Sequence, residues 1–446
     1  MANTYLTRTF GTPTNNLKWT FSAWIKKSGF DGNQALLSSG ADANNRGLIY
    51  LADNGRLFLY ETTSGTDTTE IGTNRLFRDV SAWYHIVVAV DTSQGTEANR
   101  VKIYVNGTQE TSISPSNYPS VNAANFINSA VRHDISGRNN HSSSDLYFNG
   151  LMSHIHLIDG TAYDATAFGE TDATTGEWVG KTSPSVTYGN NGFFILKDGN
   201  GITDQSGEGN DFTLGGGTLT DLKDNPDNNF ATLNPLNSWG NTVLTNGNLT
   251  AGNTGTSGGH VSSTMHMNKG KWYMEFNVDT HLSGYSAPMF FLAGTGAFQQ
   301  QETTFSASGD GAFGIASNGR SITDGQESSS VVFPVLVNND KVQIAYDADA
   351  GKAWFGINGT YLNSGNPTTA ANPYFTSTKL QNNDVSFKSI GYDGNAMSAN
   401  FGNGYFGTTA ITTNSGNGYA GAEGASKFNY TVPTGYSALS TKGLNE

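Results

Sequence analysis

The chain reads His85-Ile86-Val87-Val88-Ala89-Val90-Asp91, then a polar loop, then Val101-Lys102-Ile103-Tyr104-Val105-Asn106-Gly107-Thr108. The same pattern returns in the second half as Val342-Gln343-Ile344-Ala345-Tyr346-Asp347, a loop, and Ala353-Trp354-Phe355-Gly356-Ile357-Asn358-Gly359-Thr360. Each copy predicts two paired strands and a tight turn, because alternating residues bury one face and Asn-Gly supplies the positive φ angles of a hairpin. We therefore predict an all-β fold class with two tandem antiparallel β-sandwiches.

Composition and length support two domains. The chain has 446 residues, which is long for one antiparallel core, and 55 glycines with a charged fraction of only 14%. Aromatic residues make up 11% and can fill two cores. A polar, proline-containing stretch without periodicity marks a linker. We predict a first domain over residues 1–217, a linker over 218–241 and a second domain over 242–446.

Strands are expected at the short apolar runs. The run that contains Trp19, Phe21, Ala23 and Ile25 places these four side chains on one face. Almost no segment has a helical period, so few helices are expected. In the first domain we predict strands over 17–26, 35–38, 47–51, 56–60, 83–90, 101–105 and 145–158, and in the second over 271–278, 289–292, 311–315, 342–346, 353–357 and 399–401.

Charge and composition exclude several partners. The net charge is −13 and no block of Lys or Arg occurs, so neither nucleic acid nor an anionic membrane is an expected partner. The absence of Cys excludes disulfides, thiolate metal sites and cysteine nucleophiles. No basic and apolar leader follows Met1, and no apolar run approaches the roughly 18 residues of a membrane span. We therefore expect neither secretion by a signal peptide nor membrane insertion.

Several motifs resemble known families. Trp19-Thr20-Phe21-Ser22-Ala23-Trp24, the strand 82–87, the turn 103–107 and Phe148-Asn149-Gly150 resemble a laminin-G-like domain of the concanavalin A-like jelly-roll class. The stretches 270–276, 340–347, 354–359 and 399–402 are similar to a SPRY domain. The flanking segments 229–236 and 433–442 resemble segments that accompany these domains in virion proteins of tailed bacteriophages.

The resemblance implies a structural protein of the phage virion, located on the particle surface or tail. It leaves open a tail fibre or appendage and a head decoration. The implied activity is non-enzymatic binding of host-surface glycans or of neighbouring virion proteins, in a homo-oligomer that is a trimer by analogy with phage fibres. Two alternatives are a polysaccharide-degrading glycoside hydrolase on the virion and a purely architectural decoration protein.

Sugar binding needs aromatic faces and polar partners on a loop rim. Tyr60 and Tyr285 are the candidate stacking platforms. The polar candidates are Asn44, Asn45 and Arg46 in one loop and Arg138, Asn139, Asn140 and His141 in another.

The sequence offers little for catalysis. A retaining glycosidase needs two carboxyl groups about 5 to 5.5 Å apart. The nearest candidates are Glu170 with Asp172, and Glu275 with Asp279, and neither pair follows the Glu-x-Asp-x-Glu pattern of the concanavalin-like enzymes. Composition permits a Ser-His-Asp triad, but no Gly-x-Ser-x-Gly elbow supports one. We predict no catalytic residue.

Metal sites are weakly indicated. His154 and His156 share one strand face, a spacing that metal sites use, but no third ligand follows, and we expect two polar residues outside a core face of Ile155 and Leu157. Calcium is the one metal for which we name candidates, Asp198, Asn200 and Asp204, although Gly209 stands where a calcium loop needs Glu. The loop from Asp347 to Gly351 likewise has Asn358 at that position. Three Gly-x-Gly-x-x-Gly matches, at 309–314, 402–407 and 416–421, are expected to be turns.

Overall fold

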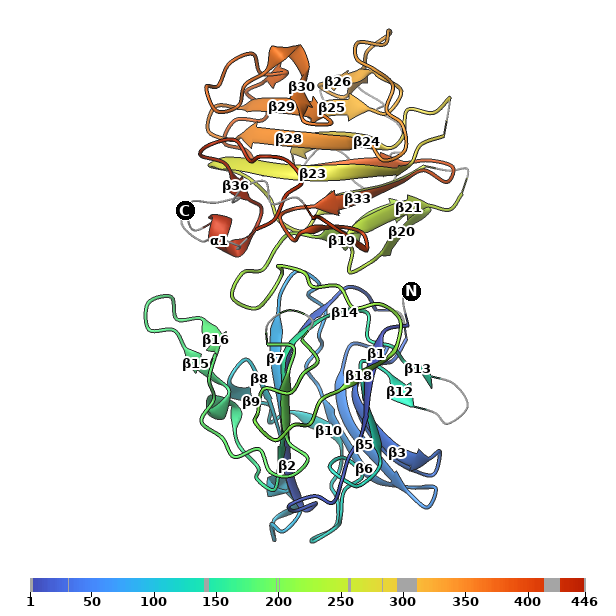
Figure 1. Ribbon diagram of the computed structural model, residues 1–446, viewed down its shortest axis with the longest axis vertical. Helices are drawn as coiled ribbons and strands as arrows, with labels where there is room; N and C mark the ends of the chain where they lie inside the picture. Colours follow the sequence, from blue (N-terminus) through green and yellow to red (C-terminus); the bar gives the residue numbers. More distant parts are fainter. Residues whose placement is uncertain are drawn as a thin grey trace. The chain divides into compact units, whose positions relative to one another are not determined.

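The computed structural model describes residues 3–30, 32–139, 144–197, 199, 201–255, 258–282, 284–294, 311–412 and 426–444. The chain forms two compact units, Met1–Asp221 and Leu222–Glu446 (Figure 1). In both units the strands pair antiparallel, except that β36 (Ser437–Ala438) pairs parallel with β23 (Lys271–Thr280). The described residues form a single α-helix, α1 (Thr441–Leu444), and the 3-10 helices η1 (Glu97–Asn99), η2 (Ala165–Ala167) and η3 (Leu362–Ser364). No helix among these residues is long and apolar enough to cross a membrane. The predicted all-β fold class is confirmed.

The first unit packs two sheets against each other. In order across the larger, eight-stranded sheet lie β10 (Ile113–Asn117), β6 (Thr66–Thr73), β5 (Leu57–Thr63), β4 (Asn45–Leu51), β3 (Gln34–Asp42), β11 (Arg132–Ile135), β1 (Tyr5–Thr9) and β18 (Thr213–Gly216). The six-stranded sheet runs β17 (Phe193–Ile195), β14 (Gly150–Asp159), β2 (Lys18–Lys27), β7 (Tyr84–Asp91), β8 (Val101–Val105) and β9 (Thr108–Gln109).

The core of this unit follows from alternation along the strands. Trp19, Phe21, Ala23 and Ile25 of β2 all lie in the core, as predicted, and the even positions 20, 22, 24 and 26 face the other side of the sheet. The β8–β9 hairpin turns at Asn106 and Gly107, whose φ angles are 46° and 80°. The Asn-Gly signal therefore marks a hairpin turn here, as it does at Asn358 and Gly359, with φ angles of 50° and 88°.

The expected strand over Asp145–Ile158 is correct only in its second part. Asp145 belongs to a separate small hairpin of β12 (Arg138–Asn139) and β13 (Ser144–Asp145), and β14 begins at Gly150. Leu146 has a φ of 50°, which breaks the extended backbone between the two strands. The carbonyl oxygen of Lys26 would lie 2.2 Å from a Cβ at Gly150, so β14 starts where its backbone closely approaches β2.

A second hairpin covers the six-stranded sheet from outside. It consists of β15 (Gly169–Thr171) and β16 (Trp178–Gly180) and lies on the side of β7 and β8 that faces away from β3, β5 and β6 (Figure 1). A small apolar cluster that includes Val87, Ile158, Phe168 and Phe194 fills the space beneath this side of the unit. The outer face of the six-stranded sheet is therefore buried.

The second unit repeats the two-sheet plan. One sheet runs β19 (Leu233–Gly240), β22 (Gly259–Ser263), β32 (Val385–Gly391), β24 (Met289–Gly294), β25 (Ala312–Ala316), β26 (Ser321–Thr323) and β27 (Gln326–Glu327). The other contains β20 (Thr242–Thr245), β21 (Thr250–Asn253), β33 (Ala396–Asn400), β23 (Lys271–Thr280), β28 (Lys341–Asp347), β29 (Lys352–Ile357) and β30 (Thr360–Tyr361), joined by β31 (Phe375–Thr376) and β36 (Ser437–Ala438). A two-stranded ribbon of β34 (Tyr405–Phe406) and β35 (Thr409–Ala410) lies apart from both.

Most of the segment predicted as a linker contributes to the second unit. The contacts divide the chain between Asp221 and Leu222, and Phe230 is fully buried in the second unit. This segment pairs with the end of the chain, since the amide of Ala231 donates to the carbonyl of Leu439 at 2.9 Å. The amide of Thr441 donates to the carbonyl of Asn229, also at 2.9 Å. The two segments that carry the phage resemblance are therefore neighbours in the fold.

Candidate functional site

The outer face of the eight-stranded sheet presents aromatic side chains. Leu59 and Ile49 point into the core, so their neighbours Tyr60 and Tyr50 lie on the opposite face. Tyr50 is paired with Phe58 across β4 and β5, and their rings stack at a centroid distance of 5.3 Å and an angle of 18°. Tyr50 and Tyr60 are partly exposed. The two tyrosines form the accessible part of an aromatic platform in which the Phe58 ring is buried, and we call this platform the β4–β5 face.

Glycine makes room for the stacked rings. A Cβ at Gly72 would lie 2.5 Å from Cε1 of Phe58, so β6 needs a glycine beside this ring. The guanidinium of Arg56 lies 5.1 Å from the centre of the same ring and donates from Nε to the carbonyl of Thr73 at 2.5 Å. Phe58 is thereby fixed in place, and Tyr50 receives a rigid neighbour.

Carboxylates surround the platform. The hydroxyl of Tyr60 donates to Asp67, and the Thr62 hydroxyl lies 3.0 Å from the same carboxylate oxygen. Glu70 is the direct cross-strand partner of Tyr60. Burial raises the pKa of Tyr50, and nearby Glu70, Tyr60 and Asp53 raise it further. The face therefore combines flat apolar rings with hydrogen-bond acceptors, as sugar sites do.

The β3–β4 turn borders this platform. The amide of Ser64 donates to Oδ1 of Asn45 at 3.0 Å, and the amide of Gly65 donates to the carbonyl of Asn44 at 3.0 Å. Arg46 is paired across the strands with Thr62. Four sequence-predicted candidates, Asn44, Asn45, Arg46 and Tyr60, are thus brought together by neighbouring strands.

The second predicted loop lies next to β3. Arg138 forms two hydrogen bonds with Asp145, at 2.8 and 2.5 Å, and these bonds raise its pKa. The hairpin is attached to the large sheet because the amide of Ala35 donates to the carbonyl of Leu146 at 2.7 Å. Ala35 is the cross-strand partner of Tyr50, so the hairpin joins the sheet beside the platform. Asn139 lies in β12, and Asn140 and His141 lie outside the described residues.

Tyr285 belongs to the other unit. Its hydroxyl donates to Asp393 at 2.7 Å, and its ring lies 5.2 Å from that of Tyr392. It is an independent candidate and forms no part of the β4–β5 face.

Asp204 is engaged within its own loop. One carboxylate oxygen accepts from the amides of Phe194 and Ser206, and the other accepts from the Ser206 hydroxyl and the amide of Asn210, at 2.6 to 2.9 Å. Asp198 and Asn200 lie outside the described residues, so calcium binding stays a prediction. No group of three potential metal-ligating side chains occurs in the part of the chain that the structure describes.

The two histidines of β14 differ from the expectation. Ile155 and Leu157 lie in the core as predicted, but His156 is also buried and stacks on Phe194 at 3.9 Å. The reason is that the outer face of this sheet is covered by other segments. His154 has a φ of 47° at an irregularity in the pairing of β14 with β2, so the two imidazoles do not follow a regular strand repeat.

His85 is the functional-looking residue that the sequence did not single out. Its Nε2 lies 2.9 Å from the hydroxyl of Ser22, and its Nδ1 accepts a hydrogen bond from Nε1 of Trp178 at 2.9 Å. Because the indole nitrogen only donates, Nδ1 is unprotonated and Nε2 carries the hydrogen. His85 therefore donates to Ser22 and cannot accept its proton. Burial lowers the pKa of His85 to about 3.

Two buried carboxyl groups carry shifted pKa values. Burial raises the pKa of Glu61 to about 8, although the amides of Phe126 and Ile127 donate to it at 3.1 and 3.2 Å. Burial raises the pKa of Glu275 to about 7. Glu61 was not predicted, because nothing in its local sequence distinguishes a buried Glu from a solvated one.

Three of the four acids considered for catalysis accept hydrogen bonds from neighbouring groups of the chain. Glu275 accepts from the Tyr273 hydroxyl at 2.8 Å and from the amides of Asn429 and Tyr430 at 2.7 and 2.8 Å. Asp279 accepts from the Ser398 hydroxyl at 2.6 Å. Glu170 lies in β15, and Asp172 accepts from the amides of residues 174 and 175 in the hairpin turn.

The glycine-rich matches are turns where they are described. Gly402, Gly404 and Gly407 have φ angles of 119°, 91° and 59°. The first two precede β34, the third lies between β34 and β35, and no helix follows them directly. The match at 416–421 lies outside the described residues, as does the start of the match at 309–314.

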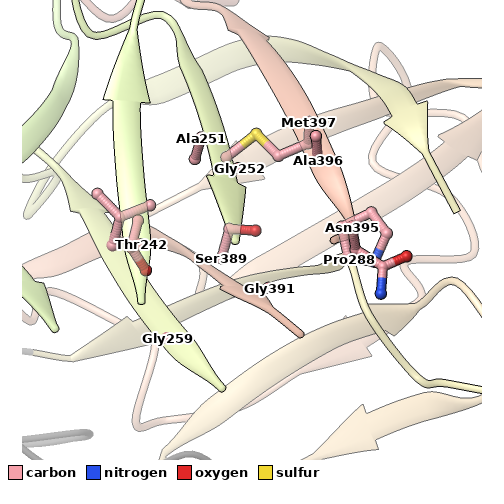
Figure 2. Close-up of a pocket in the computed structure, with 11 residues that line it drawn as sticks. Thr242, Ala251, Gly252, Gly259, Pro288, Ser389, Gly391, Asn395, Ala396 and Met397 are labelled. Carbon is pink, nitrogen blue, oxygen red and sulfur yellow. The ribbon is translucent and has the colours of Figure 1, made fainter. Parts of the chain in front are cut away.

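A small pocket lies in the second unit (Figure 2). Thr242, Ala251, Val261, Ser389 and Met397 line it from strands of both sheets. Its volume is about 10 Å³, which is room for roughly one water molecule. It is too small for a sugar ring.

Comparison with known proteins agrees with this fold. Residues 2–166 match the Laminin_G_3 family, described as the concanavalin A-like lectin/glucanases superfamily. No curated protein matches the chain. The resemblance of the first half to concanavalin A-like domains is thus confirmed over the matched residues.

Solved structures with some similarity include three proteins of low identity. The SPRY domain of human HERC1 is 12% identical with a TM-score of 0.30, and the match covers 37% of this chain and 96% of that one. A putative carbohydrate binding protein from Bacteroides ovatus is 16% identical with a TM-score of 0.32, covering 49% and 58%. The CBM40 of a Ruminococcus gnavus sialidase bound to α2,3-sialyllactose is 17% identical with a TM-score of 0.24, covering 30% and 71%.

Proposed function

We propose that the protein is a non-enzymatic glycan-binding protein and that the β4–β5 face is its sugar-binding surface. The observation that carries the proposal is the partly exposed Tyr50, stacked on the buried ring of Phe58 beside the partly exposed Tyr60, on a sheet face with carboxylates at its border. Aromatic rings contact the apolar faces of sugar rings, and the carboxylates accept their hydroxyl hydrogens. The lectin/glucanase description of the family matched by residues 2–166 supports the same function.

Two glycan-array experiments test this proposal. The purified chain is expected to bind a subset of glycans, and Tyr50→Ala is expected to reduce that binding at least about tenfold through loss of a stacking contact. Tyr285→Ala in the second unit is the matched control and is expected to leave binding unchanged. If Tyr285→Ala abolished glycan binding and Tyr50→Ala did not, the binding site would lie in the second unit and the proposal for the β4–β5 face would be wrong.

The non-enzymatic part of the proposal has its own assay. We expect no release of reducing sugars from host polysaccharides by the purified chain. Release that is abolished by Asp67→Asn or Glu70→Gln would establish a glycoside hydrolase and overturn this part.

We further propose that the glycan-binding unit works on the surface or tail of a bacteriophage particle, as a homo-oligomer. The support is the resemblance of segments 229–236 and 433–442 to phage virion proteins, together with their direct pairing in the second unit. Electron microscopy of intact particles with a labelled antibody distinguishes tail from head. Absence of the chain from purified particles would remove the virion role and leave the glycan-binding proposal intact.

A further inference from the structure

Arg46 lies on the β4–β5 face without an intramolecular partner. Its Nε is buried and has no hydrogen-bond partner, and no ion pair among the described residues includes Arg46. Leaving a buried donor unpaired is costly, and more so on a charged group. Arg46 as a whole is partly exposed, so an acidic ligand that pairs with its guanidinium gains binding free energy at this position.

The strand register shows what surrounds Arg46. The cross-strand row runs from Arg132 through Gly40, Arg46 and Thr62 to Asp67. Gly40 contributes no side chain, and a Cβ there would lie 3.1 Å from Cβ of Arg46. In this row β3 therefore places no side chain directly beside Arg46.

The carboxylates of this region are already engaged elsewhere. Asp67 accepts from the hydroxyls of Tyr60 and Thr62. Asp134 forms two hydrogen bonds with Arg132, at 2.9 and 3.0 Å. Asp42 accepts from the amide of Asn44 and the side-chain amide of Asn45. Each of these three carboxylates has its own donors, and none of the ion pairs among the described residues includes Arg46.

We propose that Arg46 binds the carboxylate of an acidic sugar residue while the aromatic platform holds the neighbouring sugar. This inference rests on the proposed glycan-binding function and names its ligand class, a uronic or sialic acid within an oligosaccharide. The planar guanidinium fork matches a carboxylate in two parallel hydrogen bonds, which a hydroxyl group cannot reproduce. A single acidic residue fits better than a polyanion, because the chain has a net charge of −13 and Asp67 and Glu70 border the face.

The test uses pairs of oligosaccharides that differ only at the carboxylate. Each acidic oligosaccharide, with one uronic or one sialic acid, is compared with its carboxyl-reduced form by isothermal titration calorimetry on the full chain. The acidic form is expected to bind roughly ten- to hundredfold more tightly, as a charge-assisted hydrogen bond allows. Arg46→Gln is expected to abolish that preference while leaving the affinity for the reduced form unchanged.

Two further variants separate the charge of Arg46 from its hydrogen-bonding geometry and control for the loss of an arginine elsewhere. Arg46→Lys retains the charge and loses the fork, so we expect only part of the preference to survive. Arg78→Gln removes an exposed arginine of the same unit and is expected to change nothing. Urea unfolding of each variant verifies that it is folded.

The outcomes separate this inference from the proposed function. Equal affinity for acidic and reduced forms, with binding still dependent on Tyr50, would overturn the role of Arg46 and keep the glycan-binding function. A preference that Arg46→Gln retains would overturn it as well. If no glycan of either kind binds, both proposals fall.

Discussion

Trp178 donates a hydrogen bond from Nε1 to Nδ1 of His85, and this bond fastens the β15–β16 hairpin to the six-stranded sheet. The indole also packs against Gly107 and Gly169, where a Cβ would lie 2.5 to 2.8 Å from its ring atoms. The hairpin covers this face of the sheet, and a partly buried hydrogen bond joins it to β7, which lies far from it in the sequence.

We predict that Trp178→Phe destabilises the first unit by about 1–3 kcal/mol, because it leaves the buried Nδ1 of His85 without a donor while retaining an aromatic ring. Urea unfolding followed by circular dichroism measures the loss in the first unit's transition. Trp239→Phe, in the second unit, is the control and should not change the urea midpoint of the first unit's transition. An unchanged midpoint in Trp178→Phe would show that the bond contributes nothing.

Acid is expected to destabilise the first unit through its buried histidines. Burial lowers the pKa of both His85 and His133 to about 3. The unfolded chain binds protons at these residues from about pH 6.5 downward, whereas the folded chain does not until about pH 3. Stability should fall across this interval by up to about 1.4 kcal/mol per pH unit for each histidine. Urea unfolding at pH 7, 6, 5 and 4 measures how steeply the free energy of unfolding falls with pH. His133→Gln should make this dependence shallower by the contribution of one histidine. An unchanged dependence would refute the lowered pKa of His133.

Glu61 is expected to act in the opposite direction. Burial raises its pKa in the folded chain to about 8 from the ordinary value of 4.5, so the unfolded chain releases this proton first as the pH rises. The stability contributed by protonated Glu61 is complete below pH 4.5 and is lost between pH 4.5 and 8. Glu61→Gln keeps an acceptor for the two amides and does not ionise. The free energy of unfolding of this variant minus that of the natural chain should therefore be larger at pH 8 than at pH 4. The exposed control Glu97→Gln should show no such pH dependence. A difference that does not vary with pH would contradict this.

The predictable part of the structure is the part that local chemistry determines. The faces of β2 and the Asn-Gly turns follow from alternation and from the φ preference of glycine, and both are confirmed. β6 was missed because its sequence, Thr-Asp-Thr-Thr-Glu-Ile-Gly-Thr, has one large apolar residue and resembles a loop. It becomes a strand because β5 and β10 pair with it on either side.

The sequence predicted only some residues of the candidate site, because strand pairing brings together residues that are separate in the sequence. Tyr60 and Arg46 were identified as separate loop residues, and strand pairing places them on one face. Tyr50 and Phe58 were not identified, because they lie eight positions apart in the sequence and their rings stack only once the two strands pair. The role of His85 depends on Trp178, which lies 93 positions away in the chain.

The space beside Phe58 gives a specific test of the platform. Gly72→Ala would place a methyl group 2.5 Å from Cε1 of Phe58, so the ring must move and its stack with Tyr50 must change. We expect glycan affinity to fall at least about tenfold, with a destabilisation of about 1–3 kcal/mol from overpacking. Gly95→Ala is the matched control, since nothing lies within 4 Å of a Cβ there. Full affinity in Gly72→Ala would show that the stacked pair is not part of the binding surface.

Glu275 is expected to hold the end of the chain on the second unit. Its two carboxylate oxygens accept from the amides of Asn429 and Tyr430, so the segment 426–444 is joined to β23 by a buried acid. Glu275→Gln turns one acceptor into a donor that faces an amide hydrogen, at a cost of about 1–3 kcal/mol. We expect faster hydrogen exchange at the amides of Asn429 and Tyr430 and earlier proteolysis of this segment, while the exposed control Asp384→Asn leaves both unchanged. Because the fold pairs this segment with residues 229–231, their amides should lose protection as well. Exchange that stays as slow as in the natural chain would mean that the apolar contacts of Phe428 and Tyr436 hold the segment without the carboxylate.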